Sequence, residues 1–273
     1  MKRYITCMTI AGSDPSGGAG IQADLKTFAA LGCYGQAAIT ALTVQNTLGV
    51  KRSVPVDAQL LGDQVEAVWE DVMPDAVKIG ITATADIILK LAQLIERWRP
   101  PFVVLDPVMI SSSGHSLMDS EACMALRDRL MPLCHLITPN IPEAQALLGD
   151  KCQQNTLQSM AQTLSELEGH IAVLVKGGHS DSEPTDVLYS EGRIHTFTAP
   201  RISTSNTHGT GCTLSSAIAA YRARGLHLPE AIGEAKTYLS AALAAGSAIY
   251  AGHGNGSMNH FFSPESALMK ENA

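Results

Sequence analysis

The chain has 273 residues, of which 45% are apolar and 16% are charged, and its formal net charge is −7. This length fits one large α/β domain or two small ones, and the apolar content is sufficient for a buried core. The negative charge argues against a general nucleic-acid binder, which needs a basic surface, although a few local donors can still hold a phosphate group.

Strand-like and helix-like segments alternate along the chain. The pattern predicts strands over residues 4–11, 37–44, 76–79, 102–105, 135–138, 171–175, 186–189 and 193–198. It predicts helices over residues 19–31, 57–72, 85–97, 119–131, 142–148, 154–167, 212–224 and 229–250. Such alternation predicts an α/β fold with a mainly parallel sheet covered on both faces, and the last two strands indicate an antiparallel edge hairpin. No linker divides the chain, so we expect a single domain over residues 1–273.

The cysteines and the apolar segments indicate a cytoplasmic protein. Six cysteines are scattered without a CxxC pair, as is typical of reduced thiols in a cytosolic chain. The apolar stretch near the N-terminus precedes a Gly/Ser turn and predicts a buried strand rather than a signal peptide. The uncharged segment over residues 237–252 is too short, and too rich in small residues, to cross a bilayer, so we expect no membrane role.

A glycine-rich loop, residues 12–20, follows the first predicted strand. In parallel α/β folds, ligands bind beyond the carboxyl ends of the strands. Gly18-x-Gly20-x-x-Ala23 fits the loose dinucleotide fingerprint, but no carboxylate follows Asp24 until Asp57, so the expected ribose partner is missing and a dehydrogenase is disfavoured. Asp14 could accept a hydrogen bond from a substrate hydroxyl or amine. The structural alternative is a tight turn that caps the following helix.

A second glycine-rich junction, His208-Gly209-Thr210-Gly211-Cys212-Thr213, precedes a predicted helix. Free backbone amides at a helix start favour an anion, and a kinase needs such donors around the transferring phosphoryl group. A thiol in the first helical turn tends to have a lowered pKa, so Cys212 could take a proton from an alcohol. Alternatively, Thr210 caps the helix and Cys212 is a small apolar residue. The chain has no Gly-Lys-Ser/Thr phosphate loop.

Further polar residues end other predicted strands. Lys176 could neutralise nucleotide phosphates, or it is a solvated loop lysine. Asn140 and Glu143 have capping-box spacing, and the functional alternative is that they hold Mg²⁺ through water. Asp106 is the other carboxylate that we expect near the metal, although a strand-end aspartate is also a common turn residue. Gln45 can both donate to and accept from a pyrimidine edge.

Together these segments resemble the hydroxymethylpyrimidine/phosphomethylpyrimidine kinases of thiamine biosynthesis, in the ribokinase superfamily. The resemblance is carried by residues 11–27, 45–47, 78–80, 138–144, 176–179 and 206–213, in the family's order over nearly the whole chain. It implies a ribokinase-like three-layer sandwich, ATP and Mg²⁺ as cofactors, and a homodimer. It also implies two phosphoryl transfers, first to 4-amino-5-hydroxymethyl-2-methylpyrimidine and then to its monophosphate.

The resemblance also implies roles for individual residues. Gly12, Asp14, Ala19, Gln45 and Val108 would line the pyrimidine pocket, and Gly209, Thr210 and Gly211 would form the anion hole. Lys176 would contact the ATP phosphates, and Cys212 would take the position that many superfamily members fill with an aspartate base. Ile81 departs from the methionine that family members often carry in the pocket wall. Two alternatives remain at this point, a pyridoxine/pyridoxal kinase and a non-catalytic vitamin- or nucleotide-binding regulator.

Overall fold

A computed structural model describes residues 1–109, 118–149, 156–167, 169, 171–178 and 183–271. Within these ranges, nine strands form one sheet in the order β10-β9-β8-β7-β6-β5-β2-β3-β4. Its strands are β2 (Thr6–Ser13), β3 (Tyr34–Asn46), β4 (Gly49–Pro55), β5 (Ala76–Ile79), β6 (Val103–Leu105), β7 (Leu136–Ile137), β8 (Ala172–Lys176), β9 (Thr185–Ser190) and β10 (Arg193–Thr198). The six strands from β3 to β8 in this order are parallel, and the strands at both edges are antiparallel.

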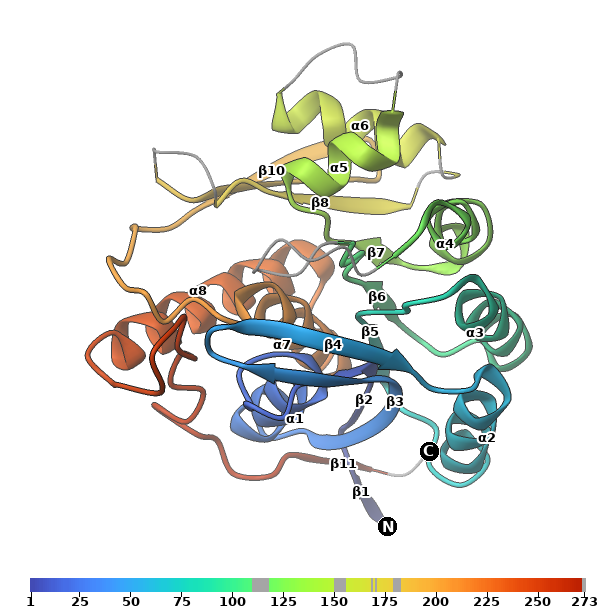
Figure 1. The fold of residues 1–273 in the computed structure, drawn as a ribbon, viewed down its shortest axis with the longest axis horizontal. Coiled ribbons are helices and arrows are strands. Elements are labelled where there is room, and N and C mark those ends of the chain that lie inside the picture. Colours follow the sequence, from blue (N-terminus) through green and yellow to red (C-terminus); the bar gives the residue numbers. More distant parts are fainter. Residues whose placement is uncertain (110–117, 150–155, 168, 170, 179–182, 272–273) are drawn as a thin grey trace.

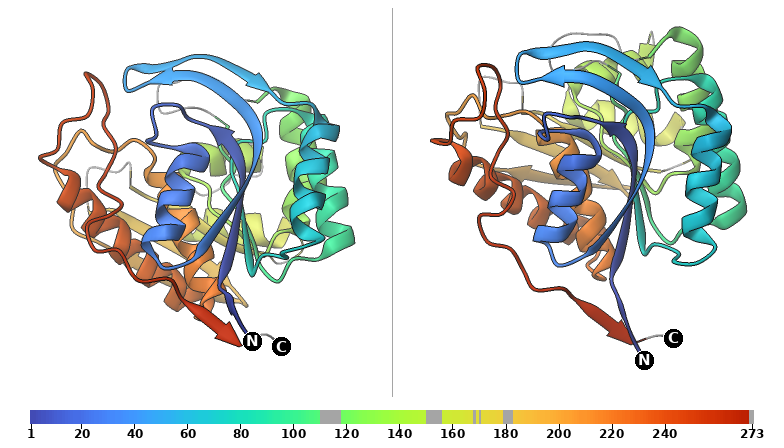
Figure 2. Two further views of the ribbon diagram at one scale, coloured as in Figure 1. Left: turned by 90° about the horizontal axis from the view of Figure 1, so that it is seen from below. Right: turned by 60° about the horizontal axis from the view of Figure 1, so that its bottom comes forward.

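Helices cover both faces of the sheet, as the alternating sequence pattern predicted. One face carries α1 (Gly20–Ala30), α7 (Thr210–Ala223) and α8 (Leu228–Gly246). The other face carries α2 (Ala58–Trp69), α3 (Ala85–Trp98), α4 (Ser120–Ala125), α5 (Ile141–Leu148) and α6 (Leu157–Leu167). The two apolar cores lie between the sheet and these layers, so the three-layer sandwich is confirmed (Figures 1 and 2).

Several predicted bounds were wrong for local physical reasons. The strand predicted over 37–44 continues to Asn46 and turns into β4, which the sequence reading missed because an edge strand carries charged residues such as Lys51 and Arg52. The helix predicted over 119–131 ends as α4 and continues as a π turn and a 3-10 turn around Pro132. Residues 154–155 of another predicted helix lie outside the described ranges.

The two chain ends form a small second sheet that the sequence did not predict. Strand β1 (Lys2–Tyr4) pairs antiparallel with β11 (Met269–Glu271), and the ends lie together in Figure 1. Asp75 clamps this sheet because it receives hydrogen bonds from Arg3 at 2.7 Å and from Lys270 at 2.6 Å. Within the described ranges, every helix is too short or too polar to span a lipid bilayer.

Candidate active site

The anion loop begins helix α7 two residues earlier than predicted. Gly209, with φ of 83°, is the N-cap, and its carbonyl accepts the amide of Thr213 at 2.9 Å. The prediction that Thr210 caps the helix was therefore wrong, because a left-handed backbone that glycine adopts freely makes the turn instead. The amides of Gly211 and Cys212 precede the first helical hydrogen bond, so they remain available to an anion.

The anion loop interlocks with the glycine-rich loop that follows β2. A Cβ atom on Gly209 would lie 1.9 Å from the carbonyl oxygen of Gly18, so only glycine fits at position 209. A Cβ atom on Gly18 would in turn lie 2.3 Å from Cδ2 of His208. The two loops are 190 residues apart in sequence, yet each needs a glycine where it touches the other.

Asp14 organises the first loop and is almost fully buried, with 2% exposed. Its Oδ1 accepts the amide and hydroxyl of Ser16 at 2.8 and 2.6 Å. Its Oδ2 accepts the amides of Gly18 and Ala19 at 3.1 and 2.8 Å and faces Nε2 of His208 at 2.8 Å. Burial would raise the pKa of Asp14, but the hydrogen bonds from His208 and Ser16 lower it to about 2. Both oxygens are thus occupied within the protein.

The opposite side of the anion loop meets a lysine and a carboxylate. A Cβ atom on Gly211 would lie 3.4 Å from both Oδ2 of Asp106 and Nζ of Lys176. Lys176 donates to Oδ1 of Asp106 at 2.6 Å, and Thr138 reaches the same oxygen at 3.2 Å. The anion loop therefore lies between the first loop and Lys176, which brings three of the predicted segments together.

Asn140 and Glu143 form the capping box that their spacing predicted. The Asn140 amide donates to Oε2 of Glu143 at 2.8 Å, and Oδ1 of Asn140 accepts the Glu143 amide at 2.9 Å. Burial raises the pKa of Glu143 to about 7, with a further increase from Asp106 and an opposing effect of Lys176. The second oxygen of Glu143 and Oδ2 of Asp106 are hard donors of the kind that hydrated Mg²⁺ accepts.

The protein environment raises the pKa of the Cys212 thiol instead of lowering it. Burial has the largest effect, and Asp24 and Asp106 add to it, whereas Lys78 and the Gly20 amide oppose it, so that the pKa is about 11. The expectation of a lowered pKa was therefore wrong, because the helix start lies next to carboxylates and away from water.

A buried ion pair lies beneath this cysteine. Lys78 and Asp24 are both fully buried and are joined at 2.8 and 3.0 Å. Asp24 also accepts the hydroxyls of Thr9 and Ser216, both at 2.6 Å. The pair thus ties β2, α1, β5 and α7 together. It supplies the polar partners that a buried charge requires.

The predicted pocket residues lie at the carboxyl ends of the central strands. Gly12 faces Ile81, because a Cβ atom on the glycine would lie 3.6 Å from Cδ1 of the isoleucine. The Val108 amide donates to the Asp106 carbonyl at 2.8 Å, which places this half-buried side chain beside the carboxylate. Gln45 contacts His208 at 3.1 Å. Sequence reasoning left His208 without a role, although its position directly before the anion loop was a usable signal.

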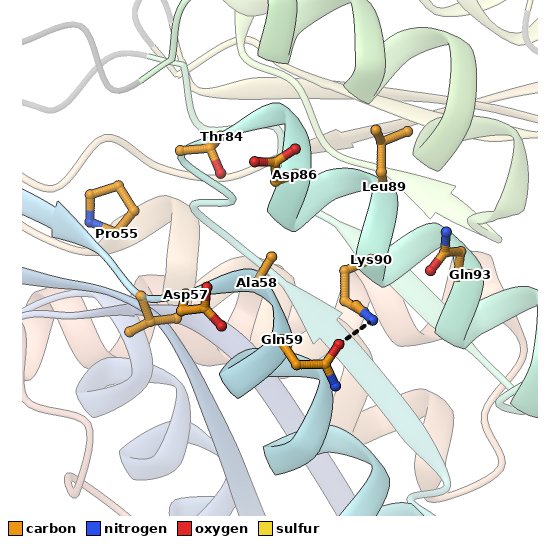
Figure 3. Close-up of a pocket in the computed structure, with 10 residues that line it drawn as sticks. Pro55, Asp57, Ala58, Gln59, Thr84, Asp86, Leu89, Lys90 and Gln93 are labelled. Carbon is orange, nitrogen blue, oxygen red and sulfur yellow. Dashed lines mark hydrogen bonds between the residues drawn. The ribbon is translucent and has the colours of Figure 1, made fainter.

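A cleft of about 530 Å³ lies elsewhere, between the first turns of α2 and α3 (Figure 3). It is lined by polar side chains, among them Asp57, Asp86 and Lys90, and Lys90 bonds Gln59 across it at 3.0 Å. None of the predicted site residues lines this cleft. Within the described ranges, no three His, Cys, Asp or Glu residues form a group able to hold a metal by themselves.

Comparisons with known proteins agree with this geometry. The family model described as phosphomethylpyrimidine kinase matches residues 14–259, a span that includes the anion loop and both flanking clusters. The hydroxymethylpyrimidine/phosphomethylpyrimidine kinase of Escherichia coli K12 is 48% identical over 263 residues, which cover 96% of this chain and 98% of that protein.

Two solved structures share the fold. The phosphomethylpyrimidine kinase of Clostridium difficile 630 is 43% identical, with a TM-score of 0.77, and the match covers 88% of this chain and 99% of that one. An ADP complex of Bacillus subtilis pyridoxal kinase is 33% identical, with a TM-score of 0.84, and the match covers 94% and 98%. The fold is thus common to both kinds of kinase, whereas the family model and the higher sequence identities distinguish them. The chain belongs to the phosphomethylpyrimidine kinase family.

Proposed function

We propose that this protein uses ATP to phosphorylate the hydroxymethyl group of 4-amino-5-hydroxymethyl-2-methylpyrimidine and then phosphorylates the resulting monophosphate. The observation that carries the proposal is the position of the α7 amides, with the first loop on one side and Lys176 on the other. Donors that surround a transferring phosphoryl group supply the charge stabilisation that such a reaction needs. The family relatives at 48% identity support the substrate.

In this proposal the phosphate donor lies against Lys176 and the anion loop. The amides of Gly211 and Cys212, with Gly209 and Thr210 shaping the turn, hold the phosphoryl oxygens, and Lys176 neutralises charge between donor and acceptor. Asp106, Glu143 and Asn140 would hold Mg²⁺ through water, and the ion would neutralise phosphate charge when bound. Asp106 already orients Lys176 at 2.6 Å.

Cys212 is the proposed base for the first transfer. The first acceptor is a neutral alcohol and benefits from proton removal, whereas the second is an anionic phosphate and needs no base. Because its pKa is about 11, the thiol is protonated at neutral pH, and Lys78 is the nearby charge that favours the thiolate. The approach of substrate, which excludes water, would therefore have to be coupled to proton transfer from the alcohol.

The pyrimidine is proposed to lie among Gly12, Ala19, Gln45, Ile81 and Val108. Gln45 offers a donor and an acceptor to the ring edge, and Ile81 supplies an apolar wall. Asp14 supports this pocket through the loop that it organises, because its oxygens already accept hydrogen bonds from that loop and face His208.

A pyridoxal kinase activity is the second candidate. The observation that favours it is the TM-score of 0.84 to the pyridoxal kinase of Bacillus subtilis, higher than the 0.77 to the phosphomethylpyrimidine kinase of Clostridium difficile. Pyridoxal offers the same kind of alcohol on a similar ring, so the same anion loop would serve either substrate.

We also propose a single catalytic domain over residues 1–273, a cytoplasmic location and a homodimer. One main sheet that runs through the described residues supports the first proposal. The free cysteines support the second, since reduced thiols are typical of the cytosol. The homodimer rests on the family resemblance.

Release of ADP from Mg-ATP tests the function directly. Separate assays would contain the hydroxymethylpyrimidine, its monophosphate, pyridoxine or pyridoxal, with Lys176→Met as the inactive control. We expect ADP with both pyrimidines, and no activity above background in the control. Activity with the pyridine rings alone would overturn the substrate, and no activity with any of the four would overturn the kinase.

A further inference from the structure

Nε2 of His208 lies between two polar side chains from different segments. It is 2.8 Å from Oδ2 of Asp14 and 3.1 Å from Nε2 of Gln45. Asp14 is ionised at neutral pH, since its pKa is about 2, and an ionised carboxylate only accepts hydrogen bonds. Therefore the imidazole nitrogen that faces it must carry a proton, whether the ring is neutral or charged.

This proton conflicts with the side-chain nitrogen of Gln45. An amide NH₂ group only donates, so it cannot bond a ring nitrogen that already donates to Asp14. The ring cannot turn away, because it packs against Gly18, where even a Cβ atom would lie 2.3 Å from Cδ2 of the imidazole. The Gln45 atom that faces His208 should consequently be the amide oxygen.

Thr43 leads independently to the same orientation. Its hydroxyl donates to the carbonyl oxygen of Ser13 at 2.9 Å and also lies 3.2 Å from Oε1 of Gln45. A hydroxyl has one proton, and the shorter bond to Ser13 uses it. The remaining lone pair on Thr43 then faces an oxygen, unless the amide is turned so that its NH₂ group donates to Thr43. Amide oxygen and nitrogen are similar in size, so these neighbours decide the orientation.

We infer that His208 and Thr43 fix the Gln45 amide with its oxygen toward His208 and its nitrogen toward Thr43, and that His208 is thereby a specificity-determining positioning residue. For the substrate, the inference rests on the proposed function. One N–H and one oxygen lone pair of Gln45 remain free. They match a ring edge that has an acceptor nitrogen beside an amino group, which is the pattern of a 4-aminopyrimidine.

A fixed amide rejects the reversed pattern. In the 4-oxo analogue, in which oxygen replaces the amino group, the ring nitrogen carries a proton and the exocyclic atom accepts. Recognition of this analogue would require the Gln45 amide to turn by 180°, which would break its bonds to both His208 and Thr43. Sites that leave a buried polar group unpaired with the wrong substrate discriminate strongly.

The proton position can be measured without substrate. Protein labelled with ¹⁵N-histidine would be examined by long-range ¹H–¹⁵N correlation, with His208→Asn to assign the signal. We expect a proton on Nε2 of His208 in the ligand-free protein. A ring with its proton on Nδ1 alone would overturn the inference, and this result would not depend on the identity of the substrate.

Discrimination between the two pyrimidines is the second test. We expect wild type and Thr43→Ser, which keeps the hydroxyl, to share one ratio of kcat/KM for the amino and oxo compounds. The His208→Asn/Thr43→Val double variant, once shown by its melting curve to be folded, should lower that ratio by about tenfold or more, since two hydrogen bonds are lost. An unchanged ratio in the double variant would contradict the inference. If wild type phosphorylates neither compound, the proposed function fails, and the proton position still decides the inference.

Discussion

The two sides of the anion loop differ in how their polar groups are satisfied. On the closed side, Asp14, Gly18 and His208 use one another, and Asp14 receives hydrogen bonds on both oxygens. On the open side, Asp106, Lys176 and Glu143 form a cluster of charges in which burial holds the pKa of Glu143 at about 7. The comparison suggests that the closed side sets geometry and the open side receives the charged ligand, with Cys212 between them.

The largest effect should follow from removal of the base between the two sides. We expect Cys212→Ala to slow phosphorylation of the hydroxymethyl group by about a thousandfold, within the range for loss of a general base. The second transfer should slow much less, because its acceptor is already anionic. Single-turnover assays with each substrate would measure both steps. Equal losses would indicate a positional role for the thiol.

Next in size is a change at the contact between the closed side and the anion loop. Gly209→Ala places a methyl group 1.9 Å from the Gly18 carbonyl on a backbone with φ of 83°, so the loop must move. We expect kcat to fall by roughly a hundredfold, as for a displacement of catalytic groups by about 1 Å. Gly178→Ala is the matched control, since nothing lies within 4 Å of its Cβ position. Equal kcat values for both variants would argue against the interlocked loops.

A smaller effect concerns the support behind the loop. His260 is buried and lies 3.0 Å from Thr213 in the first turn of α7, and burial, together with Lys26, lowers its pKa to about 4. The unfolded chain takes up a proton near pH 6.5 and the folded protein does not, so stability falls as pH falls from about 6.5 to 4. We expect a loss of roughly 2 kcal/mol between pH 7.5 and 5.

Denaturant unfolding at several pH values would measure this contribution. The His260→Gln variant cannot titrate and should show a flatter profile over the same range. A profile parallel to that of wild type would assign the pH dependence to other groups.

The smallest effect should come from the terminal clamp, which lies away from both sides. Asp75→Asn weakens the hydrogen bonds with Arg3 and Lys270 and should cost on the order of 1 kcal/mol of unfolding free energy. The Arg3 and Lys270 bonds lower the pKa of Asp75 despite its burial, so this contribution is present near neutral pH and is lost in acid. Thermal melts would show the shift, and kcat should stay unchanged. A fall in kcat would link the clamp to the site.

The comparison also shows what the sequence could predict. Strand-end positions correctly grouped Asp106, Asn140, Glu143 and Lys176, because parallel strands place their carboxyl ends along one edge. The same logic placed the glycine-rich loops but gave no account of Asp14, whose donors include the distant His208. The Cys212 pKa was wrong in direction, because the effect of a helix start is local, whereas the burial and carboxylates that outweigh it come from tertiary packing.

The most direct test is a crystal structure with the hydroxymethylpyrimidine and a non-hydrolysable ATP analogue. The account predicts the terminal phosphoryl group on the amides of Gly211 and Cys212, between Lys176 and the substrate hydroxyl. The pyrimidine edge should face Gln45. A terminal phosphate bound away from the start of α7, or a pyrimidine bound on the far side of the sheet, would contradict it.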